Sequence, residues 1–487
     1  MIAALLLGGG TRPGFASDLL LQLIALPLLA GSLWHLMASP YERLPLTALS
    51  FFAALVLVSF LQLVPLPPAL WAQLPQRQAE VEVFQLLGSE LPWRPLSIRP
   101  ASTWSSALSL VVPLAIFLAV IQLDNRERRE LTMIILGVAA ITVFLGLSQI
   151  SFGPAAAIRF YEFTNIREAT GFFANRNHLA AFLYCSFLFA AAWAIEASLA
   201  AQPWHRRMPT ETIVSIAAAV TIMISLIAAQ AMTRSRGGLV LGSLAILGAF
   251  AMTLVDRRRA SGITPAKVLG AAIVVGVMLA AQFALYRISQ RLGIDPLQNA
   301  RAVIGRTTVE AAHTLMPWGS GIGTFVPMYA LFEKPSDLVA NTFANRAHND
   351  FLEFWLECGV IAPLFFLAFA AWFSRSASAA WLHRSDHGVP IDAALTRACS
   401  LVILLLLAHS FIDYPLRTAA MAAIFALACA FLIPPIIDGN EDHRGCPRPA
   451  APLAARRTAS PPSGQSVRAA PVPAAWKSDR GWPDEWK

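Results

Sequence analysis

Charged residues are scarce in this chain of 487 residues. Asp, Glu, Lys and Arg make up 14% of the sequence, whereas hydrophobic residues make up 56%. Soluble globular domains contain about 25% charged and about 45–50% apolar residues. The apolar residues also occur in long blocks, and 107–123 and 213–232 contain no charge at all. The composition therefore excludes a soluble domain and indicates a membrane protein.

The sequence also lacks the alternation of apolar and polar residues that is typical of outer-membrane barrel strands. A run of about 18 or more apolar residues instead predicts a transmembrane helix, because a helix satisfies its own backbone hydrogen bonds in lipid. We predict an all-α polytopic bundle of about eleven (10–12) helices. The predicted spans are 19–37, 47–66, 106–123, 131–151, 177–198, 212–232, 236–255, 268–286, 351–373, 395–412 and 417–435.

Signatures of several other functions are missing. The five cysteines fall mostly within apolar blocks without metal-type spacing, so we interpret them as packing residues and predict no metal site. No Walker or kinase motif is present, and no internal repeat is evident, which argues against an ATP-driven pump and a secondary transporter. The pI near 9.6 is explained by basic cytoplasmic loops, so we predict no nucleic-acid partner.

Basic loops predict the orientation. Arg and Lys concentrate in the short connections 124–130, 201–211 and 256–267, which alternate correctly with the spans and are predicted to be cytoplasmic. Residues 1–435 would form the transmembrane domain, and 436–487, rich in Pro, Ala, Arg and Ser, a disordered cytoplasmic tail. The apolar start at 1–10 lacks a basic segment, so we expect no cleaved signal peptide.

Longer segments are predicted on the opposite face, and they contain many Arg but few Lys. Guanidinium groups suit bidentate binding of phosphate or carboxylate, so an anionic ligand outside the cytoplasm is one explanation. Snorkelling of Arg at helix ends, or a genome rich in G and C, is the other. The segments are about 67–105, 152–176, 233–237, 287–350 and 409–417, and their Arg include Arg159, Arg167, Arg176, Arg234, Arg236, Arg287, Arg291, Arg301, Arg306, Arg346 and Arg417.

Residues 305–359 are the most informative stretch. Three glycines alternate in PWGSGIGTF at 317–325, which predicts a loop with tight turns that is mobile or faces a ligand. Asp350 and Glu353 fit a variant of the capping box, which places a helix start at the membrane surface. His348 would then lie at the water interface, where an imidazole can act as a general base; a plain interface residue is the alternative.

The chain resembles the O-antigen ligase family, which shares its core with O-antigen and exopolysaccharide polymerases. The resemblance covers about residues 165–430 and implies a GT-C-like membrane glycosyltransferase with a large periplasmic loop at 287–350. The matching motifs, in order, are TGFFANRNHLAAFL at 170–183, TRSRGG at 233–238, GRTTVEAAHTLMPWGSGIGTF at 305–325, AHNDFLEFWLECG at 347–359 and HSFIDYPLR at 409–417.

By this resemblance, the substrate donor is a glycan on undecaprenyl pyrophosphate, used at the periplasmic face of the bacterial inner membrane. The acceptor would be a sugar hydroxyl of lipid A-core for a ligase, or a second lipid-linked glycan for a polymerase, which the motifs do not separate. No cofactor is implied, because the pyrophosphate is itself the leaving group. A lipid-linked glycan flippase is a further alternative, but a flippase should place its cations along a cavity within the bundle.

The resemblance also implies roles for individual residues. His348 matches the base that deprotonates the acceptor hydroxyl, and Arg236 matches the catalytic Arg of the SRG motif. Arg306 matches the Arg of the large outer loop, and both Arg would neutralise the charge that develops on the pyrophosphate. Secondary candidates for substrate binding are Arg234, Arg176 and Arg417.

Overall fold

The computed structural model describes residues 1–435 except 13, 15, 39–44, 155–156, 163, 201–209, 260–296 (of which 276–278, 282 and 284 are described), 339–342 and 383–389. The predicted tail at 436–487 and most of the predicted span at 268–286 lie outside these residues. Parts of the predicted loop at 287–350 do so as well.

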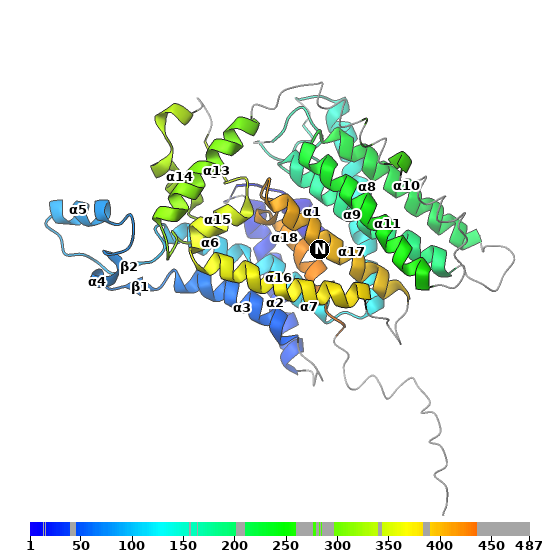
Figure 1. Ribbon diagram of the computed structural model, residues 1–487, viewed down its shortest axis with the longest axis horizontal. Helices are drawn as coiled ribbons and strands as arrows, with labels where there is room; N and C mark the ends of the chain where they lie inside the picture. Colours follow the sequence, from blue (N-terminus) through cyan, green and yellow to red (C-terminus); the bar gives the residue numbers. More distant parts are fainter. Residues whose placement is uncertain are drawn as a thin grey trace, which may run out of the picture. The chain divides into compact units, whose positions relative to one another are not determined.

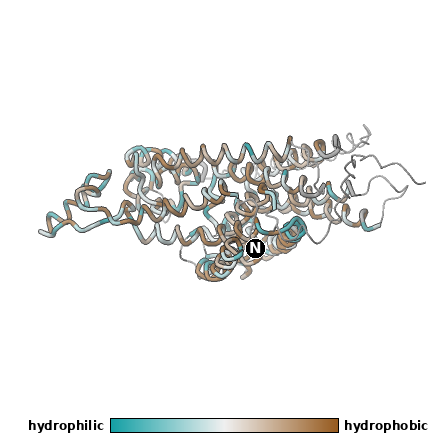
Figure 2. The backbone as a smooth tube through the Cα atoms, turned by 90° about the horizontal axis from the view of Figure 1, so that it is seen from below, coloured by the Kyte–Doolittle hydropathy of each residue, from teal (hydrophilic) through white to brown (hydrophobic). Residues whose placement is uncertain are grey.

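Long apolar helices form most of the described structure, as the composition predicts (Figure 1). Apolar residues predominate along these helices (Figure 2). The helices of sixteen or more residues are α2 (Ala16–Ala38), α3 (Leu46–Leu61), α8 (Asn125–Ser151), α9 (Arg176–Ala200), α10 (Thr210–Met232), α11 (Arg236–Arg259), α13 (Leu297–Thr314), α16 (Ile361–Leu382) and α17 (Pro390–Ser410).

Shorter elements lie between them. Two strands, β1 (Pro65–Leu66) and β2 (Arg94–Pro95), pair antiparallel, with Pro65 opposite Pro95. The short helices are α1 (Ile2–Leu7), α4 (Pro68–Trp71), α5 (Gln78–Leu86), α6 (Pro100–Ser109), α7 (Val111–Ile121), α14 (Phe325–Phe332), η1 (Pro335–Asp337), α15 (Asp350–Cys358), η2 (Pro415–Arg417) and α18 (Ala419–Phe431).

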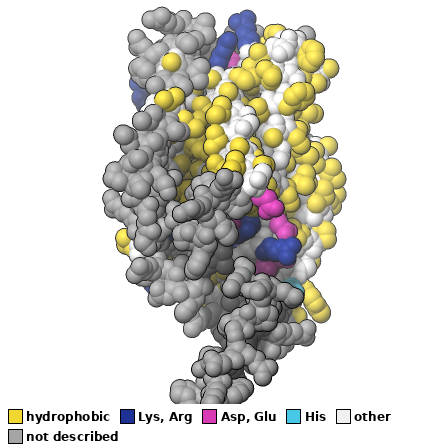
Figure 3. All heavy atoms as spheres, turned by 90° about the vertical axis from the view of Figure 1, so that its right-hand side faces the viewer, with side chains coloured by type: hydrophobic (Ala, Val, Ile, Leu, Met, Phe, Trp, Pro, Cys, Tyr) yellow, Lys and Arg dark blue, Asp and Glu magenta, His cyan; other side chains and the backbone are white. Residues whose placement is uncertain are grey.

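Helix α9 is the centre of the bundle. Its most apolar stretch is 89% buried, because α8, α10, α11 and α17 all pack against it. Small residues such as Ala180 and Ala190 allow the neighbouring backbones to approach closely. Helix α16, in contrast, is only 6% buried over the corresponding stretch, so it lies at the periphery. Hydrophobic side chains also cover much of the described part of the face in Figure 3, as expected for a surface in contact with lipid.

Eight helical spans among the described residues are long and apolar enough to cross a membrane, so a multi-pass α-helical membrane protein is confirmed. The number of eleven and the GT-C-like fold stay predictions. At two predicted spans, 47–66 and 417–435, the apolar helices α3 and α18 have only 16 and 13 residues. The eight spans are Ala16–Ala38, Pro100–Ile121, Asn125–Ser151, Arg176–Ser198, Ile213–Met232, Arg236–Val255, Ile361–Leu382 and Ala393–Ser410.

The prediction of one continuous helix over 351–373 is wrong. Helix α15 ends at Cys358, and the chain turns at Gly359 into α16. Gly359 has φ of 55°, and a Cβ on it would lie 2.1 Å from the carbonyl oxygen of Pro317. Only glycine fits this turn, so the break is built into the sequence.

The segments that the sequence analysis assigned to one face do meet at one end of the bundle, which we call the site end. The backbone N–H of Ile98 donates to the carbonyl of Ser320 (2.9 Å), and that of Ala169 donates to Met232 (3.2 Å). At the other end, Arg128 near the start of α8 donates to the carbonyl of Ile433 beyond α18 (2.7 Å). The start of α8 and the residues just beyond α18 therefore lie together at this end.

Candidate active site

His348 lies at the site end, in an irregular segment just before α15. Its backbone has φ of 51°, in the left-handed region that residues other than glycine rarely adopt. The next residue, Asn349, caps α15, because its side-chain oxygen accepts from the N–H groups of Phe351 and Leu352, each at 3.0 Å. The predicted capping box that begins at Asp350 is therefore wrong by one residue.

Asp413 is the hydrogen-bond partner of His348. Oδ1 of Asp413 lies 3.1 Å from Nδ1 of His348, and the two side chains are 1% and 18% exposed. An ionised carboxylate only accepts hydrogen bonds, so Nδ1 carries the proton and Nε2 keeps a lone pair. The pair therefore has the geometry of a general base held by a carboxylate.

Several donors surround the carboxylate of Asp413. Asn177 donates to Oδ2, Asn175 donates to the same oxygen at 3.4 Å, and Nη2 of Arg301 lies 3.8 Å from it. Burial raises the pKa of Asp413, but the hydrogen bond from His348 and the positive charge of Arg301 help to outweigh it, and the pKa lies well below its usual range. Asp413 is therefore an anion at neutral pH.

Aromatic and imidazole rings pack beside this pair. The ring of Tyr414 contacts the rings of His348 and His178 edge-on, at centroid distances of 5.0 and 5.1 Å. His178 is fully buried, and neither of its ring nitrogens has a hydrogen-bond partner among the described residues. His409, also buried, lies 3.1 Å from the hydroxyl of Tyr184. The ring of Tyr414 thus packs against His348 and limits its movement on this side.

The turn between α10 and α11 presents Arg234 and Arg236. Arg234 is exposed and has φ of 49°, whereas Arg236 is half-buried and is the first residue of α11. Ser235 precedes α11, and its hydroxyl accepts from the N–H of Gly238 at 3.0 Å. The turn thus places two guanidinium groups at the positive end of a helix, where anions are favoured.

This helix start contacts the turn that contains Asp413. A Cβ on Gly237 would lie 2.4 Å from Cδ1 of Ile412, the residue before Asp413. The structure therefore brings the segment of Arg236 next to the turn that holds Asp413.

Helix α13 carries two Arg that differ in surroundings. Arg306, the predicted substrate-binding residue, is exposed, whereas Arg301 is half-buried and approaches Asp413. Five residues separate them, which places them about 140° apart around the helix axis. Only Arg301 is thus in contact with the pair.

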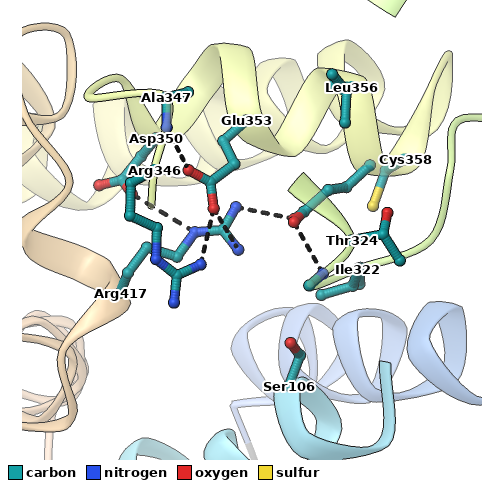
Figure 4. Close-up of polar contacts among 12 residues, drawn as sticks. Ser106, Ile322, Thr324, Arg346, Ala347, Asp350, Glu353, Leu356, Cys358 and Arg417 are labelled. Atoms are coloured by element: carbon teal, nitrogen blue, oxygen red, sulfur yellow. Dashed lines mark hydrogen bonds and ion pairs between the residues drawn. The ribbon is translucent and has the colours of Figure 1, made fainter. Parts of the chain in front are cut away.

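Two of the predicted substrate-binding Arg form ion pairs with carboxylates. Nη1 of Arg176 lies 3.0 Å from Oε1 of Glu168. Nη2 of Arg417 donates to Oε2 of Glu357 at 3.0 Å, and its Nη1 lies 3.5 Å from Oε1 of Glu353 (Figure 4).

Arg417 belongs to a buried cluster of charges under α15. Asp350, Glu353 and Glu357 follow one another on α15 at spacings of three and four residues, so they share one face, and all three are within 3.6 Å of the Arg417 guanidinium. Arg346 adds a second cation, 2.9 Å from Glu353. Burial lowers the pKa of Arg417, but the three carboxylates outweigh it and raise the pKa above its ordinary value.

The glycine-rich loop at 317–325 packs against this cluster. The N–H of Gly323 donates to Oε1 of Glu357 at 2.8 Å. Gly319 has φ of 76°, and a Cβ on it would lie 2.5 Å from the carbonyl oxygen of Glu357. The side chain of Gln62, at the end of α3, accepts from the N–H of Ile322 at 2.8 Å. The glycines thus allow the loop to approach the protein's own backbone, and a mobile or ligand-facing role of the loop stays a prediction.

Sequence reasoning missed Asp413 and did not single out Arg301. Asp413 is the only acid of the HSFIDYPLR motif, in a turn between two apolar helices, where an acid usually has a partner. Arg301 was one of many outer Arg, and nothing in its sequence neighbourhood separates it from Arg306. Among the described residues, no three His, Cys, Asp or Glu side chains are arranged to hold a metal ion. The roles of the selected residues stay predictions.

A protein-family model described as O-antigen ligase matches residues 218–367, a region that contains Arg234, Arg236, Arg306 and His348. Asp413 and Arg417 lie beyond this region. No curated protein matches the chain. The chain is therefore similar to the O-antigen ligase family over residues 218–367.

Proposed function

We propose that this protein transfers a glycan from undecaprenyl pyrophosphate to a sugar hydroxyl of lipid A-core, at the periplasmic face of the bacterial inner membrane. The observation that carries the proposal is the His348–Asp413 pair, which lies at the end of a transmembrane bundle beside the segments of Arg236 and Arg301. The O-antigen ligase match over 218–367 supports the same reaction class.

In the proposed reaction, Nε2 of His348 takes the proton from the acceptor hydroxyl. The acceptor oxygen then forms a bond to the anomeric carbon of the donor glycan. The bond from that carbon to the phosphate oxygen breaks, and its electron pair leaves with undecaprenyl pyrophosphate. Asp413 stabilises the positive charge on His348 through the hydrogen bond at Nδ1.

Guanidinium groups at the site end would stabilise the leaving pyrophosphate. Arg236 and Arg234 lie at the start of α11, and Arg306 lies on the exposed side of α13. Arg301 is an additional candidate because it lies beside Asp413. For Arg176 and Arg417, the observed ion pairs with carboxylates favour a role in positioning over direct contact with phosphate.

The test uses the purified full-length protein in liposomes with a lipid-linked glycan and a lipid A-core acceptor. We expect a glycan–lipid A-core conjugate, in the presence of EDTA as well as in its absence. His348→Ala and Arg236→Ala should abolish the transfer while the proteins keep their thermal unfolding temperature. Unchanged transfer by both variants would contradict the proposed site.

The same assay separates the two acceptors. Longer glycans on the carrier lipid without any conjugate would show a polymerase that uses a second lipid-linked glycan. Movement of the lipid-linked glycan across the bilayer without either product would show a flippase.

A further inference from the structure

His348 and Asp413 come from segments that are 65 residues apart in the chain. One hydrogen bond of 3.1 Å joins their side chains, and His348 is partly exposed. A base that is displaced by about 1 Å can lose about 100-fold in rate. Further contacts must therefore hold the two segments at this separation.

The ion pair between Arg417 and Glu353 joins the same two segments. Arg417 follows Asp413 by four residues and ends η2, and Glu353 follows His348 by five residues on α15. Nη1 of Arg417 lies 3.5 Å from Oε1 of Glu353. The other oxygen of Glu353 accepts from the backbone N–H of Ala347, the residue before His348, at 2.9 Å. The contacts form a closed ring from Asp413 through Arg417, Glu353 and the backbone to His348 (Figure 4 shows the part from Arg417 to Ala347).

Asp350 strengthens this junction. Its Oδ2 accepts from the hydroxyl of Ser410 at 2.8 Å and from the N–H of Leu416 at 3.3 Å, and both donors belong to the turn that holds Asp413. Its Oδ1 lies 3.6 Å from Nε of Arg417. The first turn of α15 is thereby attached to both ends of that turn.

Charge balance explains why such a cluster is stable without contact with a ligand. Three carboxylates face two guanidinium groups, those of Arg417 and Arg346. Burial raises the pKa of Asp350 to about 7, so this group is partly protonated at neutral pH and the cluster is close to neutral. Burial also raises the pKa of Glu353, but Arg417 and Arg346 outweigh it, and Glu353 stays ionised. The side chain of Glu353 is fully buried, so it cannot touch a substrate.

We propose that Arg417 and Glu353 are positioning residues, which hold the His348-bearing segment and the Asp413-bearing turn at the separation that general-base catalysis needs. This inference rests on the proposed glycan transfer and adds the device that assembles its base. Arg417 would thus bind carboxylates of the protein itself and not the pyrophosphate of the donor.

A double-mutant cycle in the transfer assay tests the proposal. Arg417→Met and Glu353→Gln should each lower kcat about 10- to 100-fold, with KM for the lipid-linked donor changed less than about threefold. In the Asp413→Asn background, Arg417→Met or Glu353→Gln should lower kcat by less than about threefold further. The reason is that Arg417 and Glu353 maintain the separation of His348 and Asp413, which no longer supports catalysis once the Asp413 carboxylate is absent. Arg417→Lys keeps the charge but loses the fork, so we expect it to restore only part of the rate.

The control is a half-buried Arg–Glu pair of the same kind away from the site. Arg129 and Glu196, 3.0 Å apart, join the start of α8 to the end of α9, and Arg129→Met should keep kcat within about twofold. If Arg417→Met does not fold, the double-mutant cycle of Glu353→Gln with Asp413→Asn tests the same coupling.

Two results would overturn the proposal. In the first, the kcat of a double variant with Asp413→Asn falls by the product of the two single losses. In the second, Arg417→Met raises the KM for the donor at unchanged kcat, which would place Arg417 in contact with the donor. Absence of transfer by the wild-type protein would instead contradict the proposed function itself.

Discussion

Replacement of Asp413 by Asn is the sharpest test of the base. The change keeps the size of the side chain but removes the negative charge that accepts the Nδ1 proton of His348 at 3.1 Å. A hydrogen bond between a charged group and its partner contributes about 1.5–3 kcal/mol. Asp413 is 1% exposed, so solvent screens this interaction little.

At about 1.4 kcal/mol per factor of ten, this range corresponds to a loss of about 10- to 150-fold in kcat. The amide NH₂ group that the substitution introduces can also donate to Nδ1 of His348. This contact would favour the tautomer with the proton on Nε2, and Nε2 could then no longer take the proton of the acceptor hydroxyl. The loss can therefore exceed the upper figure but should not fall below the lower one.

The assay is the initial rate of conjugate formation at saturating donor and acceptor, with thermal unfolding as the check on folding. Asp413→Glu, which keeps the charge but shifts its position, should retain more activity than Asp413→Asn. A rate for Asp413→Asn within threefold of the wild type would refute the assignment of His348 as a base held by Asp413.

Three further outcomes are expected. Arg301→Met should lower kcat at least about tenfold, because the guanidinium group of Arg301 lies 3.8 Å from Asp413. Arg306 lies on the opposite side of α13, so Arg306→Met should mainly raise the KM for the donor. Steady-state kinetics measure both constants, and equal effects of the two variants on kcat would contradict this difference. The raised pKa of Asp350 means that the folded state holds this proton more tightly than the unfolded chain, so its contribution to stability is full below about pH 4 and is lost as the pH rises through about 7. Thermal unfolding of Asp350→Asn in detergent should therefore depend less on pH between about 4 and 7 than that of the wild type, and an unchanged dependence would exclude this group as the cause. Gly319→Ala should lower the free energy of unfolding by about 1–3 kcal/mol, because φ is 76° and the new Cβ would lie 2.5 Å from a main-chain oxygen; a chemical denaturation curve like that of the wild type would show that the loop is adaptable.

The spanning helices could be predicted from the sequence because the physics is local. Each apolar block of sufficient length must be helical in lipid, whatever its neighbours are. Helices α9, α10 and α11 accordingly begin and end within a few residues of the predicted bounds. The pattern failed at α15, where a buried acidic face and Gly359 interrupt what reads as one apolar run.

The sequence by itself determined the class of the protein and predicted the segments in which the site would lie, since hydropathy and motif order are properties of short stretches. It also selected His348 and the Arg-bearing turn at the start of α11 as candidates, whose roles stay predictions. Only the tertiary structure decided which groups meet: Asp413 beside His348, Arg301 and not Arg306 beside Asp413, and Arg417 within three carboxylates. These contacts join residues that are far apart in the chain, and they depend on which side of a helix faces the neighbouring turn, so no local pattern specifies them.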